Sequence, residues 1–281
     1  MNKLEARMAL NSAGLTRVAP ELADLMLPSI RLFAKLDGNP NLVGQTRIGG
    51  LPDLPSGIDW PRWDGSPLSF IAQINLEEAT RYDLEHILPV SGLLYFFYDA
   101  QQQVYGSNPL DRNGFRVIYH PADSGLMALN NAPEELPANA RFKACSVDFS
   151  TEMTLPLEPQ LLVPALKFTN AEDKAYSAFM STFPSPADRS TRHNRLLGHP
   201  DYIQDDMHTQ VYAAANALDP HQLTETDRQK SMTDWRLLLQ LDSDDNAGMR
   251  WENNGLLYYW IESTALRERH FEKAWVVLQS E

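Results

Sequence analysis

The sequence predicts a β-rich α+β fold with two similar halves of antiparallel or mixed strands, peripheral helices and an N-terminal helical segment. Three phrases that each occur twice lead to this prediction. The pairs are Arg47–Pro55 with Arg195–Tyr202, Phe70–Asn75 with Leu237–Asp242, and Gly92–Tyr98 with Gly255–Ile261. Within each pair, residue types recur at the same offsets. We interpret this agreement as an internal duplication within one domain of 281 residues.

The organisation of the chain follows from these pairs. The first repeat is expected at about residues 29–165 and the second at about residues 190–281. Residues 1–28 precede both repeats and are expected to be helical, because Leu4 and Met8 recur at the spacing of one helix face.

Hydrophobic periodicity predicts the strands of the first repeat. Residues 29–36 alternate weakly, and residues 70–76 alternate with Gln73 on the more polar face. Residues 92–98 are too uniformly apolar for a half-exposed strand, which places them in the centre of a sheet. Further strands are predicted at 115–119, 141–149 and 153–157.

In the second half, the pattern alternates between helices and strands. Asn170 is a plausible N-cap for a helix over residues 170–180. The run 253–255, Asn-Asn-Gly, indicates a tight turn between two strands. Helices are predicted at 209–218, 225–232 and 263–270, and strands at 234–241, 255–262 and 271–279.

Polar residues that recur in both halves are the candidate ligand-binding residues. Gln73 and Gln240 occupy matching positions in apolar strands, and a buried amide must find hydrogen-bond partners. One interpretation is a structural lock, in which each glutamine ties a Gly-Pro-Asp loop to the sheet. The other is a polar cleft between the repeats that binds a ligand. The candidates are Arg47, Asp53, Gln73, Asn75, Arg195, Asp201, Gln240 and Asp242.

No metal site or cofactor is predicted. Three histidines and three aspartates cluster in the second half, but their spacing fits no compact ligand pattern. They are His193, His199, His208, Asp201, Asp205 and Asp206. The segment Asp242–Gly248 resembles the start of a calcium loop. It fails because Ala247 takes the place of the turn glycine and Asn253 that of the bidentate glutamate.

No catalytic residue is predicted either. Cys145, the one cysteine, lacks the flanking signature of a nucleophile and is expected to be a small buried residue. The sequence contains no nucleophile elbow, phosphate-binding loop or dinucleotide fingerprint. An enzyme is not excluded, because catalytic groups can converge from distant positions.

Charge and cysteine content indicate the compartment and the kind of partner. The chain has 37 acidic and 24 basic residues and a formal net charge of −13, which disfavours nucleic-acid binding. The acidity suits an ordinary soluble surface or recognition of a basic protein. A single cysteine allows no intrachain disulfide, and the chain shows no signal peptide or membrane-length apolar run. A cytoplasmic protein without a membrane partner is expected.

Two hypotheses about function remain open. The first is a non-catalytic binding protein, for example an inhibitor or immunity-type protein that masks a basic partner such as a nuclease toxin. The second is an enzyme or small-ligand receptor that uses a polar cleft between the two repeats.

Several of these motifs occur together, in order, in one known family. They include Gly49–Pro55, Trp60-Pro61, Pro67–Asn75 and Leu88–Asp99, followed by Leu197–Pro200, Leu238–Asp244, Gly255–Tyr258, Phe271 and Trp275. Over about residues 29–279 the chain resembles the YwqG-like family of uncharacterised bacterial proteins. The resemblance implies a β-rich, internally duplicated fold of unknown function, and it supplies no catalytic residues. The second half departs from the family's Gly-Gly pair, with Leu197 before Gly198.

Overall fold

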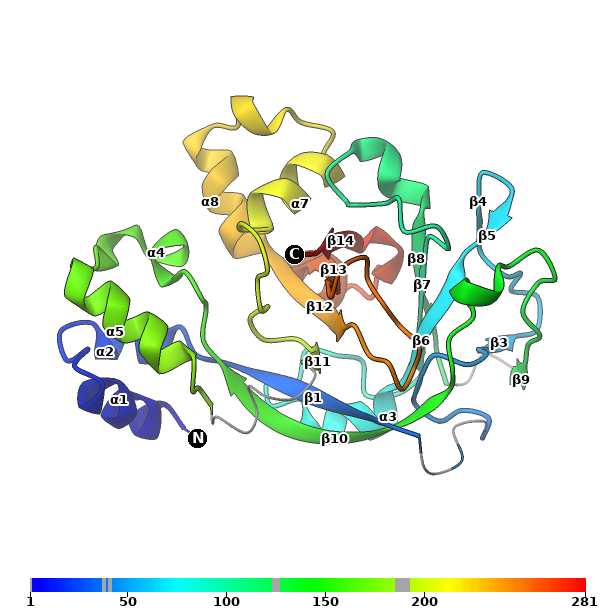
Figure 1. Ribbon diagram of the computed structural model, residues 1–281, viewed down its shortest axis with the longest axis horizontal. Coiled ribbons are helices and arrows are strands. Elements are labelled where there is room, and N and C mark those ends of the chain that lie inside the picture. The colour runs from blue at the N-terminus through cyan, green and yellow to red at the C-terminus, as the bar shows by residue number, and fades with distance from the viewer. Residues whose placement is uncertain (1, 37–38, 40–41, 123–126, 185–192) are drawn as a thin grey trace.

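The computed structural model describes residues 2–36, 39, 42–122, 127–184 and 193–281 (Figure 1). Its centre is an antiparallel sheet of ten strands in the order β14-β13-β12-β11-β1-β10-β2-β6-β7-β8. The strands are β1 (Leu27–Lys35), β2 (Arg47–Ile48), β6 (Ser69–Asn75), β7 (Leu93–Tyr98), β8 (Phe115–His120), β10 (Cys145–Thr154), β11 (Asn194–Leu196), β12 (Trp235–Asp242), β13 (Leu256–Glu262) and β14 (Trp275–Gln279). The predicted β-rich α+β class is confirmed.

The order of strands is symmetrical about the central pair β1 and β10. These two strands pair along their whole length, from Leu27 opposite Thr154 to Lys35 opposite Ser146. We call β2-β6-β7-β8 the first wing and β11-β12-β13-β14 the second wing. The first wing is hydrogen-bonded to β10 and the second to β1.

The sheet curls so that the two wings pack against each other (Figure 1). The ring centroids of Phe96 and Tyr259 lie 5.0 Å apart, and those of Phe115 and Trp275 lie 5.4 Å apart. The Tyr259 hydroxyl donates a hydrogen bond to the carbonyl of Phe97 at 3.1 Å. The main hydrophobic core therefore lies inside the curl and contains residues from both wings.

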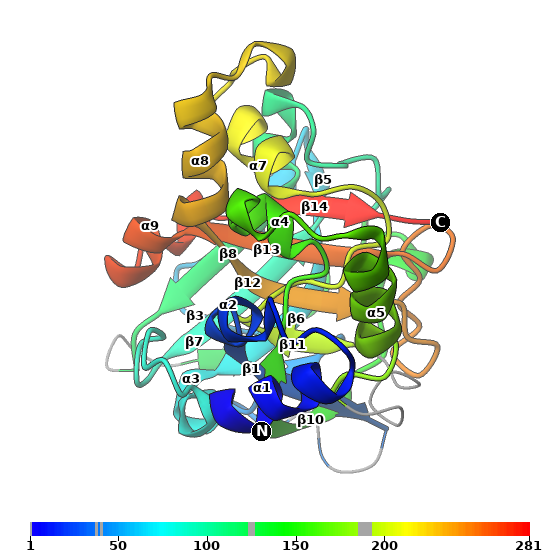
Figure 2. The same ribbon diagram turned by 90° about the vertical axis from the view of Figure 1, so that its left-hand side faces the viewer.

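Helices cover one end and one side of the sheet (Figure 2). α1, α2 and α5 form a second small core with the end of β10. α7 and α8 lie beside the second wing, with α4 next to them. The helices are α1 (Lys3–Ser12), α2 (Ala19–Asp24), α3 (Leu76–Ala79), α4 (Pro159–Leu162), α5 (Asn170–Met180), α7 (His208–Ala215), α8 (Glu225–Asp234) and α9 (Ser263–Arg267).

Several predicted boundaries differ from the structure. The two strands predicted at 141–149 and 153–157 are one continuous strand, β10. Its polar residues suit a strand whose outer face is partly exposed, so they do not mark a break. The N-cap of α5 is Thr169, not Asn170, because the Thr169 hydroxyl and the Glu172 carboxylate form a capping box.

The turn predicted at 253–255 is present, because the Gly255 N–H donates to the Trp251 carbonyl at 2.8 Å, but it does not link the two strands by itself. β12 and β13 are joined by residues 243–255, and the backbones of Asp244 and Met249 form an isolated bridge within this connection. The last strand begins at Trp275 and not at Phe271, because a short 3₁₀ turn precedes it. None of the helices in the described ranges is long and apolar enough to cross a bilayer.

Candidate functional site

Arg47, Asp53 and Gln73, which we call the first polar set, are fully buried and bonded to one another. Both nitrogens of the Arg47 fork donate to the Asp53 carboxylate, at 2.9 and 2.7 Å. The Gln73 side-chain oxygen accepts the Asp53 backbone N–H at 2.9 Å. Its amide nitrogen donates to the carboxylate and to the Gln45 carbonyl, both at 2.8 Å. All three side chains are 0% exposed, and their bonds hold the short strand β3 (Asp53–Pro55) against the large sheet.

Arg195, Asp201 and Gln240, the second polar set, form a similar set of bonds in the second wing, although a single guanidinium nitrogen of Arg195 contacts Asp201. Arg195 contacts the Asp201 carboxylate at 2.9 Å, and the Gln240 side-chain oxygen accepts the Asp201 N–H at 2.9 Å. The Gln240 amide nitrogen donates to Asp201 and to the carbonyl of His193, at 3.0 and 2.7 Å. His193 precedes Arg195 by two positions, as Gln45 precedes Arg47.

The correspondence extends to the neighbouring strands. Tyr95 donates to the Asp53 carbonyl at 2.7 Å, and Tyr258 donates to the Asp201 carbonyl at 2.5 Å. Burial raises the pKa of both phenols, so both remain hydrogen-bond donors. The register of β6 shifts two residues before Gln73, and that of β12 shifts two residues before Gln240. The bulge in β6 explains why the simple alternation predicted for residues 70–76 fails at Phe70. Phe70 packs in a different hydrophobic cluster from Ala72 and Ile74.

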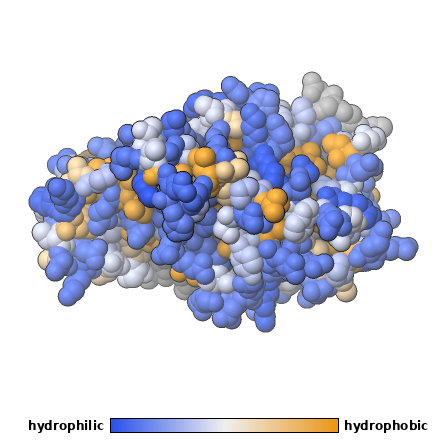
Figure 3. All heavy atoms as spheres, turned by 90° about the horizontal axis from the view of Figure 1, so that it is seen from above, coloured by the Kyte–Doolittle hydropathy of each residue, from blue (hydrophilic) through white to orange (hydrophobic). Residues whose placement is uncertain are grey.

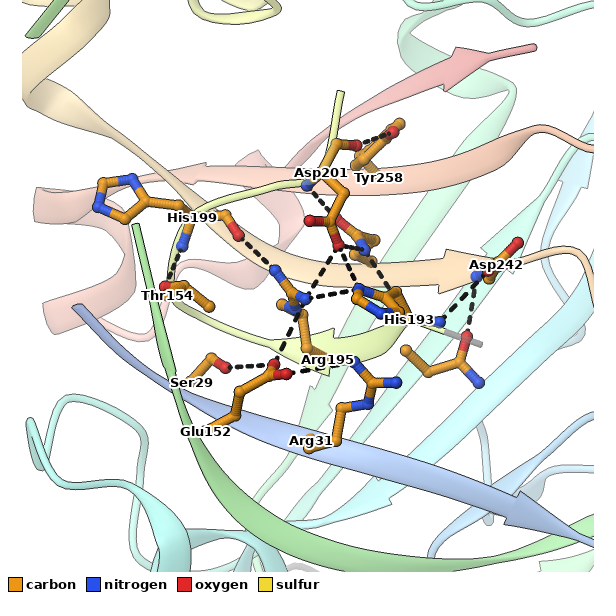
Figure 4. A network of polar contacts seen from close by, with 12 residues as sticks. Ser29, Arg31, Glu152, Thr154, His193, Arg195, His199, Asp201, Asp242 and Tyr258 are labelled. Carbon is orange, nitrogen blue, oxygen red and sulfur yellow. Dashed lines mark hydrogen bonds and ion pairs between the residues drawn. The ribbon is translucent and has the colours of Figure 1, made fainter. Parts of the chain in front are cut away.

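The second set differs from the first because it belongs to a larger charged network (Figure 4). Glu152 of β10 lies 3.3 Å from Arg195 and 3.4 Å from Arg31. The ring Nδ1 of His193 lies 2.8 Å from the Asp201 carboxylate. The same Nδ1 lies 3.0 Å from a guanidinium nitrogen of Arg195, so His193 contacts both members of the Arg195–Asp201 pair. The network thus joins β1, β10 and β11 at the middle of the sheet.

The two other candidates serve as local caps and supports. The Asn75 side chain accepts the N–H of Glu77 at the start of α3 and donates to the Gly44 carbonyl. The Asp242 carboxylate accepts the N–H of His193 at 3.3 Å.

The structure brings each polar set together but does not bring the two sets to one site. β1 and β10 lie between β2, which carries Arg47, and β11, which carries Arg195. The bonds within each set are those expected of a structural lock. Ligand binding by the eight candidates stays a prediction.

Two other features of the sequence were Cys145 and a possible metal-binding cluster. Cys145 is buried, and burial followed by the charge of Asp244 raises the pKa of its thiol. In the described part of the chain, no group of three or more His, Cys, Asp and Glu is arranged to hold a metal ion.

An acidic groove of about 760 Å³ lies between α4, α7 and α8. Its lining includes Asp205 and Asp206, which precede α7, and Glu225 of α8. Among the described residues that line it, Arg228 is the only basic one. The sequence gives no sign of this groove, because its walls come from three separate segments of the chain.

A second cavity, the inner pocket, shares a wall with the groove. It measures about 370 Å³, and Leu162, Met232 and Thr233 line both cavities. His199, His208, Glu85, Arg236, Trp235 and Trp260 also line the inner pocket. His208 Nδ1 lies 2.6 Å from the Asp206 carboxylate, so this hydrogen bond links the pocket to the groove. The spacing Asp206-x-His208 was visible in the sequence, but only as part of an apparent metal cluster.

Comparison with known proteins places the chain in a family. Residues 46–280 match DUF1963, which is described as a domain of unknown function. The chain belongs to the DUF1963 family. The match includes both polar sets and both wings of the sheet, whereas β1 lies before it. No curated protein matches this DUF1963 chain.

Proposed function

We propose that this DUF1963 protein is a non-catalytic binding protein that receives a basic segment of a partner protein in the acidic groove. The observation that carries the proposal is the charge of the groove, where Asp205, Asp206 and Glu225 face a single arginine. A basic segment would place positive charge beside these carboxylates and associate quickly through electrostatic steering.

The pKa of a neighbouring carboxyl supports this view of the groove. Burial and then the negative charges of Asp206 and Asp205 raise the pKa of Glu158, just before α4. A cation bound in the groove would offset this repulsion. The formal net charge of the whole chain, −13, is negative like the charge of the groove. Seen from above, the surface is mainly hydrophilic with small separate apolar patches, which suits a polar partner (Figure 3).

In its more specific form, the proposal is an inhibitor or immunity-type protein that masks a basic enzyme in the cytoplasm. The two wings would then serve as a scaffold. We further propose that they arose by duplication of one unit, as in the YwqG-like bacterial proteins. Their matching bonds, bulges and strand order support this origin. The alternative of an enzyme or receptor cleft between repeats is less favoured, because the two polar sets lie on opposite sides of β1 and β10.

A peptide-binding measurement tests the proposal. Fluorescent decapeptides rich in lysine and arginine, or in glutamate, are titrated with the protein at low and high salt. We expect the basic peptide alone to bind, and its affinity to fall as salt screens the carboxylates. The double variant D205N/E225Q should bind about tenfold more weakly, as expected for the loss of two partly exposed ion pairs.

A matched variant separates the groove from the general charge of the protein. Asp64 and Glu134 are exposed acids in the first half, and the groove lining includes neither of them. D64N/E134Q changes the net charge by the same amount and should bind like the wild type. Equal weakening by both double variants would show that the attraction is not located in the groove, and the proposal would be abandoned.

A further inference from the structure

Two histidines that line the inner pocket, His199 and His208, each have one ring nitrogen that can accept a hydrogen bond. His199 Nε2 donates to the carbonyl of Leu25 at 2.7 Å, so its Nδ1 keeps a lone pair. Burial lowers the pKa of His199 to about 4, which keeps the ring neutral near pH 7. His208 donates from Nδ1 to Asp206. Among the described residues, its Nε2 has no partner, although the residue is only 6% exposed.

The charges around the pocket favour a cation. Glu85 and Asp24 line it, together with one arginine, Arg236. Arg236 already lies 2.5 Å from the Glu85 carboxylate, which offsets its charge. The Asp24 side chain is 78% exposed and lies 3.3 Å from Lys3, so it can exchange this partner at little cost.

Two indole rings add a preference for a flat cation. Trp235 and Trp260 both line the pocket, and the His208 ring packs edge-on against Trp260 at 4.8 Å. A guanidinium group is planar, carries five donors, is weakly hydrated and stacks on aromatic rings. A lysine ammonium has three donors and holds its water more strongly.

We propose that the inner pocket binds the guanidinium group of an arginine in the partner's basic segment. This inference rests on the proposed function, because the arginine would enter from a segment lying in the acidic groove. Because Leu162, Met232 and Thr233 line both cavities, the arginine side chain would have a short path from the groove into the inner pocket. His199 and His208 would accept its hydrogen bonds, and Asp24 would exchange Lys3 for the guanidinium and balance its charge.

The test compares arginine with lysine in otherwise identical probes. Two decapeptides with the same charge, one with arginines and one with lysines, are titrated with the full-length protein. N-acetyl-arginine methylamide and its lysine counterpart are titrated separately and followed by tryptophan fluorescence. We expect the arginine decapeptide to bind about tenfold more tightly, and the small arginine probe alone to change the fluorescence.

Variants locate the preference. H208Q should reduce the preference for arginine to about twofold, and D24N should weaken both decapeptides alike. E77Q, a substitution of an exposed acid outside the pocket, should leave both affinities and the preference unchanged. A thermal melt of H208Q checks that the variant is folded.

Equal affinities for both decapeptides would overturn the guanidinium site and leave the basic-partner proposal standing. If neither decapeptide binds but the small arginine probe does, the basic-partner proposal fails and the pocket remains. If none of the probes binds, both are wrong.

Discussion

Replacing Gln73 by leucine tests whether the polar sets stabilise the fold. The substitution removes a buried amide that accepts from the Asp53 N–H and donates to the Gln45 carbonyl and the Asp53 carboxylate. Leucine is similar in size, so the main loss is hydrogen bonding and not packing.

The magnitude follows from the groups left without a partner. The buried N–H of Asp53 loses its acceptor at a cost of about 1–3 kcal/mol. The Asp53 carboxylate keeps Arg47 but loses one of its donors, which adds about 1 kcal/mol. Gln45 is exposed, so water can replace the donor to its carbonyl. We therefore expect Q73L to lower the free energy of unfolding by about 2–4 kcal/mol.

Urea denaturation followed by tryptophan fluorescence measures this change, with wild type and variants side by side. Q240L should cost a similar amount, because Gln240 makes the corresponding bonds to Asp201 and His193. Q103L changes an exposed glutamine and should stay within about 0.5 kcal/mol of the wild type. A loss below about 1 kcal/mol for both Q73L and Q240L would refute the structural role of the polar sets.

Three further predictions concern other buried features. The folded pKa of His199, about 4, lies below its usual 6.5, so the unfolded chain binds a proton first. Stability should therefore fall by up to about 3 kcal/mol as pH drops from 6.5 towards 4. The melting temperatures of wild type and H199Q should approach each other as pH falls through this range. A difference that stays constant with pH would contradict the lowered pKa of His199. G50A and G198A should each lower the melting temperature by several degrees more than G14A does. All three glycines have positive φ, but a Cβ would lie 2.6 Å from the Ala144 or Ser29 Cβ at the first two, whereas Gly14 faces open space. Cys145 should react with a thiol reagent only on unfolding, because it is buried and its thiol pKa is raised. Rapid labelling of the folded protein would show that the site opens.

The repeated letters of the sequence predicted the polar sets well. Arg, Asp and Gln at matched offsets implied buried partners, and the structure places them in contact. The bulges before Gln73 and Gln240 could not be predicted, because Ile71 and Leu238 are apolar residues like their neighbours. The continuity of β10 was missed since its serines, threonines and acids resemble a loop.

The groove and the inner pocket could not be predicted from the sequence for a different reason. Their walls come from α4, α7, α8 and the turn around Glu85, and only tertiary packing brings these together. Periodicity describes one element at a time, so it cannot show which faces meet.

The position of β1 has a practical consequence for work on shorter pieces of this protein. The family match starts at residue 46, yet β1 ends at Lys35 and joins β10 to β11. A fragment trimmed to the matched residues would divide the sheet at its middle and leave a long unpaired edge on β10 and a short one on β11. Such edges invite pairing with other molecules. Recombinant fragments that begin after Lys35 should therefore aggregate, whereas fragments that keep residues 27–35 retain the strand that connects the wings.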